Sequence, residues 1–97
     1  MKVLRKRGLF ERAGRHPETI PALERFYDYA RKARWHGFND VRQQFPSVDR
    51  VGDVLIFNVL GGNYRLITTV DYPTQRLFIK ALMTHREYER KEWLKWA

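Results

Sequence analysis

The feature that most restricts the fold of this chain is a pair of adjacent glycines, Gly61-Gly62, between apolar runs at 54–60 and 63–72. Two-residue hairpin turns of the primed types need positive φ at their centre, and glycine adopts positive φ without steric cost. The sequence therefore predicts an antiparallel hairpin closed by a two-residue turn. In the register that this turn sets, Asn58 lies opposite Arg65.

The predicted hairpin has two different faces, because alternate side chains of a strand point to opposite sides of a sheet. One face is polar and cationic toward the glycine end, and it carries Ile56, Asn58, Asn63, Arg65 and Ile67. The other face is apolar and carries Leu55, Phe57, Val59, Tyr64, Leu66 and Val70. We interpret the first as the functional face and the second as the core face.

A third strand is predicted at 76–83, after a turn that places Asp71 opposite Arg76. Counting on from this pair, Lys80 lies opposite Ile67 and therefore on the functional face. The three strands then form an antiparallel meander.

Helix signals flank the meander. Thr84 and Glu87 match a capping box, which predicts a C-terminal helix through Tyr88 toward Trp96. Upstream we expect an edge strand at 1–4, a short helix around 9–13, a helix over 18–34, a short helix capped by Asn39, and a linker over 47–53 with a brief strand. This order predicts one compact α+β domain over 1–97, with N-terminal helices packed on a small, mainly antiparallel sheet.

The composition favours a folded, basic protein. Of the 97 residues 43% are hydrophobic, and the net charge is +8, which favours a polyanionic partner. Residues 1–15 hold six Lys and Arg against one acid, and within them we predict RNA contacts from Lys2, Arg5, Lys6 and Arg7.

Several chemistries are excluded by residue type. The chain has no cysteine, and its three histidines, His16, His36 and His85, are scattered without a zinc-binding spacing. Ser47 is its only serine, and it lacks a nucleophile-elbow context. We therefore expect no metal and no cofactor. Because neither a signal peptide nor a membrane span is recognisable, we expect a cytoplasmic protein with no membrane partner.

The polar residues that remain suit metal-free cleavage of RNA by attack of a 2′-hydroxyl on the neighbouring phosphate. Arg65 and Lys80 supply fixed positive charge, and Asn58 and Asn63 can orient the backbone of the substrate. His85 is the candidate for proton transfer. At the first position of a helix and near two cations, we expect it to be neutral and able to act as a base. Tyr88 lies one helical turn further on.

The chain also resembles the HigB branch of the RelE/ParE toxin superfamily. The matching segments are F-N-V at 57–59, G-N-Y-R-L-I at 62–67, I-K at 79–80 and T-H-x-E-Y at 84–88, with H-P at 16–17 and Q-F-P-S at 44–47 upstream. The resemblance implies a RelE-like fold and the toxin half of a type II toxin–antitoxin pair. It also implies an endoribonuclease, or mRNA interferase, that cleaves mRNA on the translating ribosome.

The same resemblance implies partners and site residues. The partners are a helix-turn-helix antitoxin of the HigA type, mRNA and the ribosome, with operator DNA bound only through the antitoxin. The family pattern falls on Asn58, Asn63, Arg65, Lys80, His85 and Tyr88.

Three alternatives stay open from the residues alone. The chain could be a non-catalytic basic module that binds RNA or the ribosome, or a ParE-like toxin directed at gyrase. Trp93 and Trp96 could pack in the core or form a contact with a partner.

Overall fold

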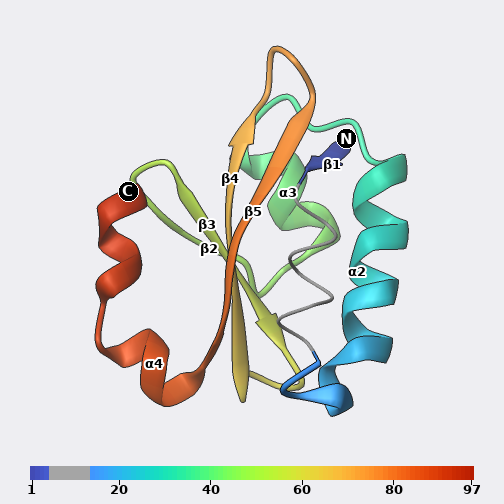
Figure 1. The fold of residues 1–97 in the computed structure, drawn as a ribbon. Helices are drawn as coiled ribbons and strands as arrows, with labels where there is room; N and C mark the ends of the chain where they lie inside the picture. The colour runs from blue at the N-terminus through green and yellow to red at the C-terminus, as the bar shows by residue number, and fades with distance from the viewer. Residues whose placement is uncertain (5–13) are drawn as a thin grey trace.

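A five-stranded sheet forms the centre of the molecule in the computed structural model, which describes residues 1–4 and 14–97 (Figure 1). The strand order is β1-β5-β4-β3-β2. Its strands are β1 (Lys2–Leu4), β2 (Asp49–Val51), β3 (Val54–Val59), β4 (Tyr64–Asp71) and β5 (Arg76–Thr84). β2 to β5 are antiparallel neighbours, and β1 adds to β5 in parallel as an edge strand. The predicted α+β class, meander, N-terminal edge strand and strand within 47–53 are therefore confirmed.

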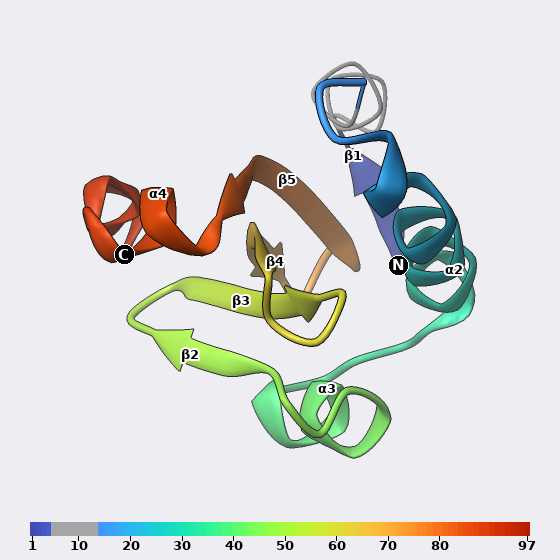
Figure 2. The same ribbon diagram turned by 90° about the horizontal axis from the view of Figure 1, so that it is seen from below.

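The helices lie on both sides of this sheet (Figure 2). A 3₁₀ turn, η1 (Pro17–Thr19), leads into α2 (Ile20–Lys32), and α3 (Phe38–Gln44) follows. The C-terminal side holds α4 (His85–Glu89) and a second 3₁₀ turn, η2 (Glu92–Trp96). Within the described residues, no helix has the length and apolar character needed to cross a membrane. The short helix predicted around 9–13 lies outside the described residues.

The main core forms between α2, α3 and the face of the sheet that the sequence assigned to it. Leu55, Phe57 and Leu66 are buried there, together with Leu23 and Phe26 of α2. Phe57 lies edge-on to Phe26, with ring centroids 4.8 Å apart. The core-face prediction is confirmed, and it fixes which side of the hairpin remains for function.

The opposite face, which we interpreted as the functional face, is partly covered. Ile56 and Ile67, which we placed on the functional face, are 2% and 0% exposed. They pack with Val54 and Trp93 in a second cluster, which the C-terminal segment covers. A small sheet with apolar residues on both faces needs a cover on each, and here the C-terminal segment supplies the second.

The first hairpin has the predicted register and a longer turn. Asn58 pairs with Arg65 and Ile56 with Ile67, as expected. The connection between the strands spans four residues, 60–63, and not two. Leu60 has φ 52° and precedes the two glycines at φ 64° and 93°, so positive φ extends over three successive residues. The register is unchanged because the longer turn adds one residue on each side of the two glycines, Leu60 before them and Asn63 after them.

The second hairpin begins as predicted, with Asp71 paired to Arg76, but its register shifts further along. A bulge between Ile67 and Thr68 places Ala81, and not Lys80, opposite Ile67. The predicted partner of Lys80 is therefore wrong, because a bulge adds one residue to one strand and no sequence alternation marks it.

Two helix ends also differ from the prediction. Asn39 lies inside α3, whose N-cap is Gly37 with extended backbone. The C-terminal helix stops after five residues, because Lys91 adopts φ 61° and η2 starts in a new direction. This change of direction brings Trp93 onto the second cluster, where it is buried, whereas Trp96 is half-buried at its margin. Core packing is therefore confirmed for Trp93.

Candidate functional site

The first part of the site joins β4 to α4. The guanidinium of Arg65 lies over the ring of Tyr88, 5.2 Å from its centroid. Tyr88 stacks in turn on Trp93, with ring centroids 5.0 Å apart and planes inclined by 1°. Arg65 also donates to the carbonyl of Gly62, which holds its charge beside the hairpin turn. Two of the predicted catalytic residues, Arg65 and Tyr88, are thus in contact.

The hydroxyl of Tyr88 stays protonated in this setting. Burial raises the pKa of its hydroxyl above the ordinary value of 10, with the carboxylate of Asp49 acting in the same direction and Arg65 opposing. The hydroxyl therefore keeps its proton at neutral pH.

Lys80 lines a groove of about 560 Å³ that runs along the outer edge of β5. Among the described residues, strand pairing on this edge ends at Phe78. The groove is bordered by Arg15, His16, Lys80, Ala81, Leu82, Met83, Glu87, Lys95 and Trp96. Three of these side chains are cationic and one is a carboxylate, so the groove favours an anionic ligand.

His85 begins α4 and is exposed to solvent. Its Nε2 lies 2.9 Å from the carboxylate of Glu89, one turn further on. While that contact lasts, Nε2 carries a proton, because a carboxylate only accepts hydrogen bonds. That His85 is a neutral base stays a prediction. The prediction did not take into account the Glu89 carboxylate, which lies beside the imidazole.

The start of α4 is fixed by the predicted capping box, which is confirmed. The backbone N–H of Thr84 donates to the Glu87 carboxylate at 3.0 Å, and the Glu87 N–H donates to the Thr84 hydroxyl at 3.2 Å. The N–H of His85 donates to the carbonyl of Asn63 at 3.1 Å, which ties the helix to the hairpin turn. The backbone of His85 is thereby held beside the turn that positions Arg65.

The predicted RNA-binding residues divide into three groups. Asn63 is exposed in the turn next to α4, and Asn58 is exposed beside Arg65 in the ladder. Lys2 pairs with Arg76 at the opposite end of β5 from Thr84, so the fold does not bring it to the others. Arg5, Lys6 and Arg7 lie outside the described residues.

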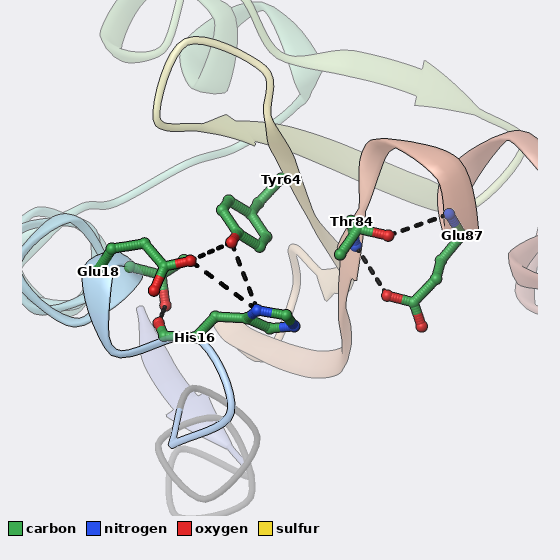
Figure 3. Close-up of polar contacts among 6 residues, drawn as sticks. His16, Glu18, Tyr64, Thr84 and Glu87 are labelled. Carbon is green, nitrogen blue, oxygen red and sulfur yellow. Dashed lines mark hydrogen bonds and ion pairs between the residues drawn. The ribbon is translucent and has the colours of Figure 1, made fainter.

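A polar cluster that the sequence did not indicate, formed by His16, Glu18 and Tyr64 (Figure 3), reaches the groove through His16. Tyr64 donates to the carboxylate of Glu18, and its hydroxyl lies 3.4 Å from Nδ1 of His16. The His16 and Tyr64 rings lie 5.0 Å apart. Forty-eight residues separate the two in the chain. The H-P pair at 16–17 was a visible signal, but no local pattern indicates that its imidazole meets β4.

The arrangement presents groups that could contact a phosphodiester and transfer protons. Within residues 1–4 and 14–97, no three His, Cys, Asp or Glu side chains gather as ligands for a metal ion. The cations of the groove and Arg65 offer charge to phosphate oxygens, and imidazole and phenol groups are available on both sides of the turn.

Comparison with known proteins identifies the family to which the chain is similar. The family described as HigB toxin, the RelE-like toxic component of a toxin–antitoxin system, matches residues 20–91. The mRNA interferase HigB of Escherichia coli O6:H1 is 25% identical over 93 residues, which cover 93% of this chain and 90% of that protein. The mRNA interferase toxin HigB of Escherichia coli K12 is 25% identical over 92 residues, covering 92% of this chain and 88% of that protein.

Proposed function

The chain belongs to the HigB family of RelE-like toxins, the toxic components of toxin–antitoxin systems, and from this we propose that it is a metal-independent endoribonuclease acting on mRNA at the translating ribosome. The names of the relatives, mRNA interferases that align with nine-tenths of the chain, support the reaction class. The structural observation that carries the proposal is the Arg65 guanidinium held over Tyr88, beside the turn that is bonded to the first residue of α4.

In the proposed reaction, the 2′-oxygen of one nucleotide attacks the adjacent phosphorus and the bond from phosphorus to the 5′-oxygen breaks. Negative charge grows on the non-bridging oxygens of the phosphate as the new bond forms. Arg65 and Lys80 stabilise this charge, and fixed cations of this kind act most strongly in the transition state. His85 and Tyr88 transfer protons, and Asn58 and Asn63 orient the RNA backbone.

The proposal includes the partners of the toxin. We infer that a helix-turn-helix antitoxin of the HigA type neutralises the protein, and that the pair binds operator DNA through the antitoxin. The toxin itself acts in the cytoplasm, where ribosomes translate the mRNA that it cleaves. Co-purification of a tagged copy with the product of the adjacent reading frame tests the antitoxin directly.

The test of the activity is induced expression combined with mapping of new mRNA ends. Wild-type protein should arrest growth and produce cuts at defined positions within translated codons. Arg65→Ala should relieve the arrest, while Arg42→Ala, which removes an exposed arginine of α3, should not. Growth arrest without cuts would favour a non-catalytic ribosome-binding module. Arrest with DNA double-strand breaks would favour a gyrase-directed toxin.

A further inference from the structure

Cleavage by a 2′-hydroxyl needs two proton transfers, one from the attacking oxygen and one to the leaving oxygen. In the proposed set, Tyr88 holds its proton, and the Nε2 of His85 is engaged by Glu89 at 2.9 Å. Tyr88 is therefore suited to donate a proton, and the Nε2 of His85 is occupied as a donor to Glu89. The site still needs an acceptor close to the groove that holds Lys80.

His16 lies at that groove, together with Lys80. Its side chain is 33% exposed, so it is partly enclosed and still open to a ligand. Among the contacts with described residues, the ring is held through Nδ1, which approaches Tyr64 at 3.4 Å and Glu18 at 3.9 Å (Figure 3). The other nitrogen, Nε2, lies on the side of the ring turned away from Tyr64.

The hydrogen bonds of this cluster set the tautomer of His16. The hydrogen bond from Tyr64 is the main cause that lowers the pKa of Glu18, so the carboxylate is ionised at neutral pH and can only accept. Tyr64 must then give its single proton to Glu18, and its oxygen can only accept from the imidazole. Nδ1 therefore carries the hydrogen, and Nε2 has a free lone pair.

We propose that His16 is the general base of the reaction and that Glu18 and Tyr64 are its positioning residues. The inference rests on the proposed RNA cleavage and adds a residue to it. Nε2 of His16 takes the proton of the 2′-hydroxyl as the 2′-oxygen bonds to phosphorus. The bond to the 5′-oxygen breaks, and this oxygen leaves with a proton from His85. Lys80 in the same groove stabilises the charge on the phosphate.

The test is the pH dependence of single-turnover cleavage in translating extracts, with the full chain and a defined mRNA. A general base contributes about 10²–10⁴-fold, so His16→Ala should slow cleavage at least about 100-fold. It should also remove the limb of the profile that rises with pH, because that limb reports loss of a proton from the base. Imidazole added to the buffer should restore part of the rate. Several charged or titratable groups bond to His16 or share its groove, and each could shift this limb. Among the described residues they are Glu18, Tyr64, Glu87, Arg15, Lys80 and Lys95.

Two further variants keep the test decisive. His36→Ala, which removes an exposed histidine ahead of α3, should leave the rate and the profile unchanged. Tyr64→Phe keeps the ring beside His16 and removes the hydroxyl, so it should slow cleavage and shift the rising limb even if His16→Ala does not fold. An unchanged pH profile in His16→Ala would overturn the role of His16 and leave the proposed RNA cleavage intact. Where His16→Ala does not fold, an unchanged profile in Tyr64→Phe would have the same meaning. Wild-type protein that makes no cuts would overturn both proposals.

Discussion

Arg65 of β4 and Tyr88 of α4 are joined by a cation–π contact, with the guanidinium carbon 5.2 Å from the ring centroid. The contact matters because it spans two elements that meet only at one end of the sheet. Strand β4 supplies the charge and α4 supplies the ring that fixes its direction. Any change that separates the two should affect the reaction more than the fold.

The first prediction concerns the charge itself. Arg65→Ala should lower the cleavage rate by about 10²–10³-fold, as expected when a group that stabilises transition-state charge is removed. The free energy of unfolding should fall by only about 0.5–1 kcal/mol, the size of a partly exposed cation–π contact. Arg65→Lys should recover part of the rate, because it restores the charge without the planar guanidinium. Chemical denaturation and cleavage assays on the same preparations check both numbers. A rate within twofold of wild type in Arg65→Ala would contradict the role.

The second prediction concerns the turn beside Arg65. A Cβ added at Gly62 would lie 3.1 Å from a guanidinium nitrogen of Arg65, whereas one added at Gly61 would meet nothing within 4 Å. Both glycines have positive φ, so alanine at either should cost about 1–2 kcal/mol in the free energy of unfolding. Only Gly62→Ala should also displace Arg65.

Displacement of a catalytic group by about 1 Å costs up to about 100-fold in rate. Gly62→Ala should therefore slow cleavage about 10- to 100-fold beyond Gly61→Ala. Measurement at a temperature where both variants are folded separates the two effects. Equal rates for the two variants would mean that Arg65 adjusts without loss.

The sequence predicts most of the sheet because the information is local. Alternation, two glycines and a capping box are enough to give the register of the first hairpin and the start of α4. The bulge that shifts Lys80 has no such marker, since it depends on how β5 fits β4 along its whole length. Lys91 adopts a left-handed conformation that its residue type rarely adopts, and the segment that follows it packs Trp93 on the second cluster, so no local preference indicates this turn.

The same difference between local and long-range contacts applies to the candidate site. The contact between Arg65 and Tyr88 joins residues that the sequence selected, because a short turn and a capped helix bring them together. The cluster around His16 joins the loop before α2 to β4, and such contacts between distant segments depend on how the helix layer packs on the sheet. For this reason the sequence identified the histidine and did not place it at the groove.

The third prediction concerns the capping box and pH. Thr84→Ala should lower the free energy of unfolding by about 1 kcal/mol, because the hydroxyl no longer accepts from the Glu87 N–H. For a domain of this size the loss corresponds to a decrease in Tm of about 4–8 °C. Thermal unfolding at neutral pH checks the value.

The hydrogen bond from the Thr84 backbone is the main cause that lowers the pKa of Glu87 below its ordinary value of 4.5. A carboxyl with a depressed pKa stabilises the fold above its unfolded pKa and loses this contribution as the pH falls through the folded pKa. Glu87→Gln keeps an acceptor for the cap and does not titrate. Wild type and Glu87→Gln should thus differ little at pH 7, and wild type should lose more stability on acidification below pH 4.5. Parallel curves at all pH values would remove Glu87 from the pH dependence.

The last prediction concerns the C-terminal cover of the second cluster. Trp93 is 4% exposed, packs against Ile56 and Ile67, and donates from Nε1 to the carbonyl of Tyr88 at 2.9 Å. Trp93→Ala should lower the free energy of unfolding by about 3–5 kcal/mol, as for other buried tryptophans. Its neighbour Leu94 is 44% exposed, and Leu94→Ala should stay within about 0.5 kcal/mol of wild type.

Trp93 also stacks on Tyr88, so removing Trp93 should slow cleavage by changing the orientation of the Tyr88 ring. Trp93→Phe preserves an aromatic surface and removes the hydrogen bond, which should cost about 1 kcal/mol. If the cover positions Tyr88, Trp93→Phe should cleave more slowly than wild type at a temperature where both are fully folded. Wild-type cleavage rates in Trp93→Phe, with the expected loss of stability, would mean that the C-terminal segment stabilises the sheet without positioning Tyr88.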